Sequence, residues 1–375
     1  MKQLILLACV LCMWGCTNFP SRYENIDKSK TRPLAIVCEP AEAAPGDTVL
    51  VKYYSFKKQT PSVAFWRLFL DIGYSNFGTR MAEKEERRLT DLWLAGSTAD
   101  SFRFVMPEST ILYSSALRIA FPDAVPGIDS LLNMLITLGV PVPPESLIAI
   151  DQFRTLTELK LHTEADITLD VTKNLTVRYS RRFNSPNVNV NPSVRWVGIY
   201  SVKKENMSAP DSINKYSGTT FQYLYNMDNP GLVSDTVVID SGCSYFVAAD
   251  SLDPGVDTGR QAYSYVSYID SGIVRPDTED VFFDWFYTNV DYQSGMAQDS
   301  LMLFVSDRSI DRVRFLPPVE TTMHDFKLYL TVRDFRPNDG IMQSTGVCFR
   351  ECSGTFSYTA AYKRWLESNR GTGLF

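Results

Sequence analysis

The chain has 375 residues, of which 45% are hydrophobic and 13% aromatic. This composition is ample for folded cores and excludes a disordered chain, and at ~100–200 residues per domain the length predicts two domains. The formal net charge of −6 argues against a nucleic-acid partner, because phosphate binding needs a basic stripe that the chain lacks.

The first sixteen residues have the pattern of an export signal. Lys2 supplies a positive start, residues 4–13 are an unbroken apolar run, and Gly15 precedes Cys16. The run fits the ~7–15 residues of a secretory signal and is shorter than the ~20 residues of a spanning helix. Its Gly-Cys ending resembles the lipobox of bacterial lipoproteins. That resemblance implies that Cys16 is acylated, that residues 1–15 are removed, and that a lipid anchor holds the chain at the membrane.

An ordinary secretory signal, with Cys16 as an unmodified thiol, is the alternative. Residues 17–31 are polar and without apolar period, so they are predicted to form a tether. Thr17 follows the cysteine where an Asp would otherwise stand. By resemblance to enteric lipoproteins, this implies the outer membrane as the location.

The first folded region is predicted to span residues 32–182. Residues 33–56 read as a strand, a Pro-Gly-Asp turn and a second strand. This opening resembles the first hairpin of immunoglobulin-like or polycystic-kidney-disease-like modules in bacterial lipoproteins. Further strands are expected at residues 63–70, 101–108, 115–121, 159–169 and 175–178, and a short charged helix or a long loop at 81–94.

A helical insert is predicted at residues 126–156. Leucines 131, 132, 135 and 138 recur at three- and four-residue spacing after Asp129, a suitable cap. Gly139 and three prolines end this helix, and a second short helix is expected after Pro144. Residues 183–193, with four Asn and two Pro, are predicted to be the linker between two domains.

The second domain is predicted to span residues 194–360, with a frayed tail at 361–375. Short strands separated by turn residues are expected at 194–202, 235–240, 243–249, 261–269, 281–287, 301–305, 312–316 and 326–332. A faint internal repeat indicates duplication. It relates residues 63–78 to 281–295, 101–108 to 312–320, and 115–121 to 326–332.

Four cysteines remain outside the signal and the lipidation site, namely Cys38, Cys243, Cys348 and Cys352. Export would place them where disulfides form, and four cysteines allow three pairings. Cys348 and Cys352 would lie ~13 Å apart in one strand, too far to bond. We expect Cys243 to pair with one of them, the alternative being four thiols in the cores.

Signals for catalysis are few. The chain has two histidines, His162 in an expected strand and His324 in an expected loop, and both are interpreted as structural or surface residues. No HExxH, GxSxG, Walker or GxGxxG motif occurs. The sequence therefore predicts no enzyme and no resident cofactor.

Residues 250–259 suggest a calcium site. Asp250, Asp253 and Asp257 could supply oxygen ligands, as acidic loops of extracellular β-modules do. A solvated turn is the alternative, and the spacing does not match the EF-hand loop.

Aromatic residues crowd the expected strand at 281–287. Strand alternation places Val281, Phe283, Trp285 and Tyr287 on one face, which we assign to the core. Phe282 and Phe286 lie on the other face, where they are either covered or form a contact surface for a sugar or a protein.

The sequence thus predicts an all-β protein of two immunoglobulin-like β-sandwich domains, the first with a short helical insert. The predicted function is that of a non-catalytic cell-envelope lipoprotein that binds or scaffolds a protein or glycan partner. The alternative is a surface glycan-binding or glycan-processing accessory protein.

Overall fold

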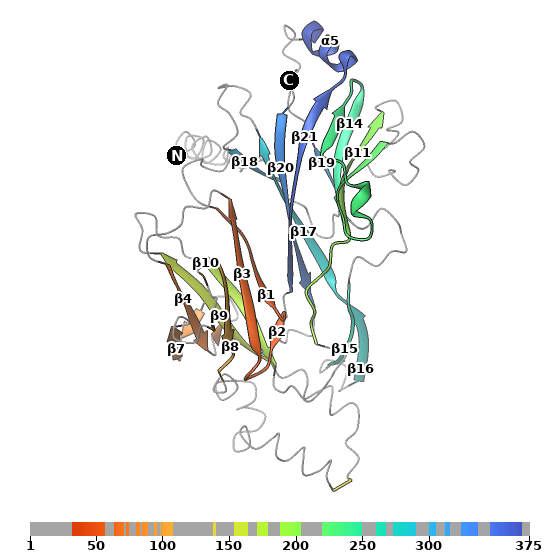
Figure 1. Cartoon of the computed structure of the whole chain (residues 1–375). Coiled ribbons are helices and arrows are strands. Elements are labelled where there is room, and N and C mark those ends of the chain that lie inside the picture. Colours follow the sequence, from red (N-terminus) through yellow and green to blue (C-terminus); the bar gives the residue numbers. More distant parts are fainter. Residues whose placement is uncertain are drawn as a thin grey trace, which may run out of the picture.

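The computed structural model describes the folded strands and some of their connections. The described residues are 32–56, 64–70, 73–74, 80–82, 85–88, 94–95, 98, 100–107, 138–139, 154–163, 171–178, 188–203, 220–249, 260–267, 273–289, 300–304, 312–315, 324–336 and 346–369. The predicted all-β class is confirmed, since strands make up most of these residues (Figure 1).

The N-terminal half forms a three-stranded and a five-stranded sheet, which we call the first sandwich. The three-stranded sheet contains, in order, β1 (Arg32–Glu39), β3 (Thr48–Phe56) and β8 (Ser101–Val105). The five-stranded sheet contains, in order, β2 (Glu42–Ala43), β10 (Val171–Arg178), β9 (Arg154–Thr163), β4 (Ala64–Leu70) and β7 (Glu85–Arg88). A separate hairpin pairs β5 (Gly73–Tyr74) with β6 (Arg80–Ala82).

The core of the first sandwich draws on both sheets. In β8, Phe102 and Phe104 are buried while their strand neighbours are exposed, as a period of two requires. They pack around Trp66 of β4, whose ring centroid lies 5.2 Å from that of Phe102. The remaining core residues are Ile36, Cys38, Ala43, Val49, Val51, Leu68, Met106, Leu175 and Val177.

The C-terminal half forms a four-stranded and a five-stranded sheet, which we call the second sandwich. The four-stranded sheet contains, in order, β12 (Thr220–Asn226), β11 (Trp196–Lys203), β14 (Cys243–Ala249) and β19 (Arg312–Phe315). The five-stranded sheet contains, in order, β13 (Thr236–Ile239), β21 (Val347–Tyr358), β20 (His324–Phe335), β17 (Asp280–Asn289) and β18 (Ser300–Phe304). A hairpin of β15 (Ala262–Ser267) and β16 (Ile273–Thr278) precedes β17.

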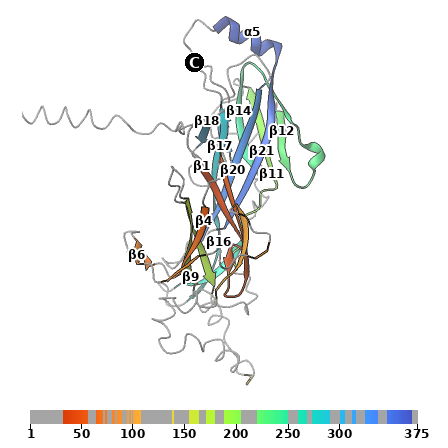
Figure 2. The ribbon, with the colours of Figure 1, turned by 60° about the vertical axis from the view of Figure 1, so that its left-hand side comes forward.

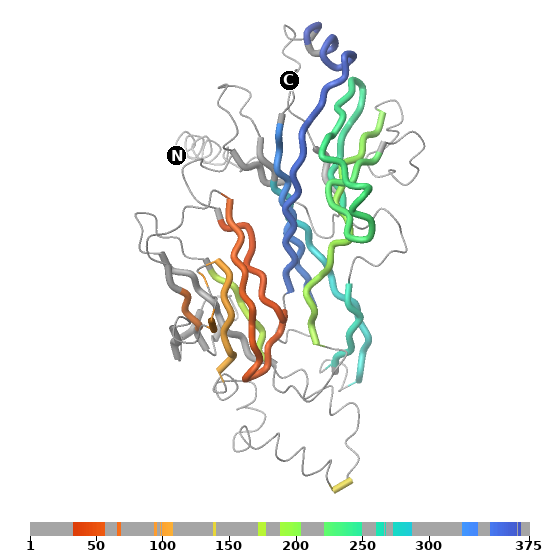
Figure 3. The backbone as a smooth tube through the Cα atoms, in the orientation of Figure 1, coloured from red at the N-terminus to blue at the C-terminus, as the bar shows by residue number. Residues whose placement is uncertain are grey.

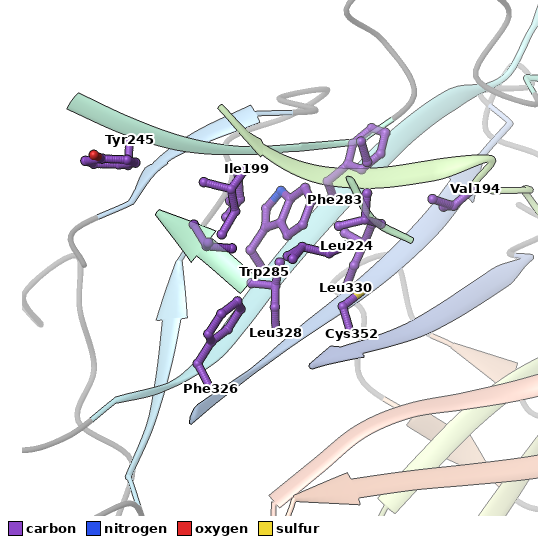
Figure 4. Packing of buried hydrophobic residues seen from close by; sticks show 14 of the residues in the cluster. Val194, Ile199, Leu224, Tyr245, Phe283, Trp285, Phe326, Leu328, Leu330 and Cys352 are labelled. Atoms are coloured by element: carbon purple, nitrogen blue, oxygen red, sulfur yellow. The ribbon is translucent and has the colours of Figure 1, made fainter. Parts of the chain in front are cut away.

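Trp285 lies at the centre of the second core (Figure 4). It is fully buried, together with Val281 and Phe283 of the same strand, which confirms the predicted inward face of β17. The facing sheet contributes Ile199 of β11 and Leu224 of β12. The side chain of Tyr287 lies outside the described part of the structure.

The two sandwiches have corresponding strand orders. In each, a short strand pairs in parallel with the last strand, β2 with β10 and β13 with β21, whereas the other neighbours are antiparallel. The order β10-β9-β4-β7 then matches β21-β20-β17-β18, and β1-β3-β8 matches β11-β14-β19. This order is shared with immunoglobulin-like sandwiches that extend the G-F-C sheet by a further strand.

The correspondence supports two of the three sequence parallels and corrects the third. β4 matches β17, and β8 matches β19, as the repeat predicted. The strand that matches β20 is β9, so residues 115–121 are not its counterpart. Those residues lie outside the described part of the chain.

Several elements differ from expectation. The segment 81–94 contains strand residues in β6 and β7, not a helix, because β7 pairs with β4 at the edge of the sheet. Residues 154–156 of the expected insert begin β9, and apart from Leu138 and Gly139 the rest of the insert is not described. His324 begins β20 and does not lie in a loop.

The tail is a second correction. Residues expected to fray form α5 (Ala360–Asn369) at the far end of the second sandwich, as Figure 2 shows. Tyr362 is buried in the second core and its ring stacks on Tyr358, with centroids 5.4 Å apart. The Thr359 hydroxyl accepts a hydrogen bond from the Tyr362 N–H (3.2 Å), so Thr359 caps the helix. Within the described ranges, no helix has the length and apolar character that a bilayer span requires.

Candidate functional site

The first strand, β1, is buried on both of its faces. Ile36 and Cys38 point into the first core, whereas Ala35 and Val37 belong to a separate apolar cluster between the two sandwiches. The sequence shows this as an unbroken apolar run from Leu34 to Cys38, the pattern of a strand covered on both sides. The strand β1 therefore contributes side chains both to the first core and to the cluster between the sandwiches.

The outer face of the second sandwich covers the far side of β1. Tyr329 of β20 and Phe349 of β21 point away from the second core and are buried in the cluster between the sandwiches. Phe349 stacks on Tyr54 of β3 with ring centroids 4.2 Å apart, and Tyr329 meets Phe56 edge to face at 6.3 Å. Burial raises the pKa of Tyr329 to about 12, so its phenol stays neutral at physiological pH. We call this region, with the polar groups beside it, the junction.

Side chains on the side of the second sandwich also donate hydrogen bonds to backbone carbonyl groups of β1. Thr331 of β20 donates its hydroxyl to the carbonyl of Leu34 (3.3 Å). The Asn191 side-chain amide donates to the carbonyl of Cys38 (2.8 Å), and its oxygen accepts from the N–H of Val347 (2.9 Å). One asparagine thus links the two sandwiches. Figure 3 shows its segment, which precedes β11, alongside the lower ends of β20 and β21.

A neighbouring asparagine makes a second bridge. The backbone N–H of Asn189 donates to Glu42 Oε2 of the first sandwich (3.2 Å), and its side-chain amide donates to Asp334 Oδ1 at the end of β20 (3.1 Å). Asp334 Oδ1 also accepts the N–H of Gly346 (2.5 Å). Asp334 is 1% exposed and Glu42 is 2% exposed, so both carboxyl groups are removed from water.

Arg336 holds the third part of the junction. Its Nε lies 2.5 Å from Glu279 Oε1 in an ion pair that is almost wholly buried. Its Nη2 donates to Gln261 Oε1 (2.7 Å), and its guanidinium lies 4.8 Å from the ring centroid of Tyr263. Gln261 in turn accepts from the N–H of Val190 and donates to the carbonyl of Val188. The segment 188–191 is therefore held from both sides.

Burial perturbs two ionisable groups at the junction. The pKa of Asp334 is raised to about 7, first by burial and then by the nearby Glu279 carboxylate. The hydrogen bonds from Gly346 and Asn189, and the charge of Arg336, oppose that rise. Burial lowers the pKa of Lys173 in β10, which Asp334 partly offsets. Within the described part of the chain, Asp334 Oδ2 is buried without a hydrogen-bond partner.

This arrangement suits the fixing of one sandwich against the other more than chemistry on a substrate. Arg336, Glu279 and Asp334 are all less than 5% exposed, so a substrate in solution has no access to them. Among the described residues, no cluster of three His, Cys, Asp or Glu side chains could hold a metal ion. The junction is a structural clasp built from buried polar groups that are hydrogen-bonded across two sandwiches.

The predicted lipidation and calcium sites fall outside the described residues. They are Cys16, with the signal and tether at residues 1–31, and the loop containing Asp250, Asp253 and Asp257. The structure therefore leaves both as predictions.

The predicted disulfide is not formed in the structure. Cys38, Cys243, Cys348 and Cys352 are all present as thiols. Cys348 and Cys352 share strand β21, and both point into the second core, where Cys243 packs at the edge. As thiols, Cys348 and Cys352 add to the apolar packing of that core, which is the arrangement that the alternative of core thiols predicted for them.

Thiol labelling of the native chain at pH 8 is expected to modify Cys243 first. Burial raises the pKa of Cys38 to about 11 and that of Cys352 to about 12, so almost no reactive thiolate forms there. Cys243 is only half-buried. Mass spectrometry of peptides after timed alkylation measures the order, with chain unfolded in guanidinium as the control in which all four react alike. Equal native rates at Cys38 and Cys243, or a Cys243 that resists alkylation until reduced, would contradict the expectation.

Phe282 and Phe286, the proposed contact surface, have different surroundings. Phe286 is half-buried and packs against the apolar cluster of the junction. Phe282 is half-buried and meets the ring of Phe335 edge to face, with centroids 5.9 Å apart. Each ring is thus partly covered by other apolar side chains and partly exposed.

The two histidines are far apart in the fold. His162 lies in β9 opposite Phe65, and His324 lies in β20 opposite Phe356. They belong to different sandwiches, and their side chains are not described.

Sequence reasoning missed the junction, although two signals for it exist. The first is the apolar run in β1. The second is the alternation Val188, Asn189, Val190, Asn191 in the predicted linker, a period of two typical of an extended segment with one face buried. Nothing in the sequence near Glu279 or Arg336 indicates that they meet.

Comparisons with known proteins identify no family. No protein-family model matches the chain, and no curated protein matches it. Among solved structures, the three N-terminal domains of the bacteriophage RB49 Highly Immunogenic Outer Capsid protein (Hoc) align over 88% of this chain and 100% of that one. The sequence identity is 7% and the TM-score is 0.17.

Proposed function

We propose that the chain is a non-catalytic binding or scaffolding lipoprotein of the bacterial cell envelope. In this proposal, lipid on Cys16 anchors it in the outer membrane, and residues 17–31 let the two sandwiches stand away from the bilayer. The partner is a protein or glycan of the envelope. The observation that carries the proposal is the junction, which joins two β-sandwiches by burying β1 on both faces.

A fixed arrangement of two sandwiches suits binding more than catalysis. Strand frameworks hold the loops at their ends in place, and such loops are where binding residues concentrate. Arg336 pairs with Glu279 out of reach of solvent and, through Gln261, holds the segment that links the two sandwiches. The glycan alternative rests on aromatic rings that are partly covered, since Phe286 packs against the junction cluster and Phe282 against Phe335.

Intact mass and detergent partitioning of the protein from its native envelope test the proposal. We expect a chain that begins at Cys16, carries the mass of three acyl chains, and enters the detergent phase. A Cys16→Ser variant is the control and is expected to stay in water. Crosslinking of the anchored protein in the envelope then identifies the partner. A water-soluble wild-type chain with an unmodified start would contradict the anchor and the scaffold with it.

A further inference from the structure

The Asp334 carboxyl group occupies an unusual place at the junction. Oδ1 is the acceptor for both Asn189 and Gly346, whereas Oδ2 is buried and has no hydrogen-bond partner within the described part of the chain. A carboxylate in this position loses its hydration on burial, and only one of its two oxygens accepts hydrogen bonds from the protein in return. Protonation removes the buried negative charge, which is the larger part of that cost.

Acidic and basic side chains from several neighbouring elements lie around Asp334. The acidic neighbours are Glu279, which precedes β17, and Glu42 of β2, which shares Asn189 with Asp334. The basic neighbours are Arg336, directly after β20, and Lys173 of β10, and Arg333 of β20 acts on Lys173. Glu279 already neutralises Arg336 at 2.5 Å, and burial disfavours the charged form of Lys173. The cations therefore compensate a charge on Asp334 only in part.

We propose that the junction is a proton-controlled latch, in which Asp334 holds a proton while the two sandwiches are docked and releases it when they separate. Docking places Lys173 of β10 and, through Asn189, Glu42 of β2 beside the carboxyl group, and separation returns that group to water. The two states therefore differ in proton affinity at one defined group. The inference holds for the fold itself and does not depend on the lipid anchor.

The sign of the pH dependence follows from that difference. Docked Asp334 has a pKa of about 7, raised from its ordinary value of 3.8. Between these values the docked state binds more protons than the separated state, so docking weakens as pH rises. The latch is closed in acid and loosens progressively up to about pH 7, above which this group adds no further dependence.

Hydrogen exchange on the full-length chain at pH 5 and pH 8 tests the latch. The probes are the amides of Gly346 and Val347, which donate to Asp334 in the same hairpin and to Asn191 of the segment that links the sandwiches. After correction for the intrinsic exchange rate, we expect their protection to fall at least about tenfold from pH 5 to pH 8, since each unit of pKa difference supplies a factor of ten. Amides of the second core, such as that of Trp285, report global unfolding and are expected to change much less.

Asp334→Asn is the decisive variant, because the amide mimics the uncharged carboxyl group. We expect its junction amides to be equally protected at both pH values. Asp284→Asn is the matched control on the same sheet, where the carboxylate pairs with Arg333 near the surface, and it is expected to keep the wild-type pH dependence. Equal protection of the wild type at both pH values, or an unchanged pH dependence in Asp334→Asn, would overturn the proposal.

A second variant covers the case in which Asp334→Asn does not fold. A Cβ at Gly346 would collide with Asp334 Oδ2 and touch Asn191 and Pro192 of the opposing segment. Gly346→Ala is therefore expected to hold the junction open, with low protection at both pH values. If the wild-type pH dependence persists in Gly346→Ala, the titrating group lies elsewhere and the latch is rejected.

Discussion

Replacing Arg336 by alanine is expected to lower the free energy of unfolding by roughly 3–5 kcal/mol, the typical cost of breaking a buried ion pair. Arg336 is 4% exposed and its partner Glu279 is fully buried, so the substitution leaves a carboxylate in the interior without its cation. It also removes the donor to Gln261, which holds the segment 188–190. Urea unfolding followed by circular dichroism measures the loss.

Arg333→Ala is the matched control, three residues earlier, near the end of β20. Arg333 pairs with Asp284 at 2.6 Å, but the two side chains are 50% and 25% exposed. A pair of this kind contributes at most about 1 kcal/mol. If the two alanine variants lose the same stability, the buried pair does not hold the junction.

A double variant tests how much of the stability comes from the charges of the pair and how much from the burial of the two side chains. Arg336→Met with Glu279→Met removes both charges and leaves apolar side chains of similar length. Replacing a buried pair in this way is often neutral or stabilising. The double variant is therefore expected to recover most of the stability that Arg336→Ala loses.

The fold could be predicted from the sequence wherever alternation was clear. The strands around Phe102 and Trp285 show a period of two with one apolar face, and both lie as expected. β21 was missed because Arg350 and Glu351 interrupt its pattern. In the structure, Arg350 lies 5.2 Å from the ring centroid of Tyr225, and Glu351 pairs with Lys327 across the sheet. The partners of these charged residues lie on other strands, so they cannot be identified from the sequence of β21 itself.

The junction could not be predicted, because its contacts join residues far apart in the chain. Asn189 bonds to Glu42 and to Asp334, each about 145 positions away. The Asn-rich composition of that segment indicates a loop, whereas its asparagines are the bridges between the sandwiches. The α5 helix was missed for a similar reason: its first turn depends on a cap by Thr359 and on burial of Tyr362, and the short sequence alone carries little helix signal.

Replacing Trp285 by alanine is the core substitution with the largest expected effect. Trp285 is fully buried among Ile199, Leu224 and Leu328, and loss of so large a side chain costs roughly 3–5 kcal/mol. Its indole N–H has no hydrogen-bond partner in the described part of the structure. Trp285→Phe keeps an aromatic ring and removes that buried donor, so it is expected to cost much less. Thermal unfolding of both variants measures the difference.

The Trp285→Ala variant also tests whether the junction couples the two sandwiches. Trp285 belongs to the second core, whereas Trp66 occupies the corresponding strand of the first. If the junction joins them into one cooperative unit, Trp285→Ala lowers hydrogen-exchange protection in β3 and β8 as well as in β17 and β20. Trp66→Ala is then expected to do the reverse. Loss of protection confined to the mutated sandwich would show that the second fold can open while the first stays closed, and that the buried polar contacts orient the sandwiches without linking their stabilities.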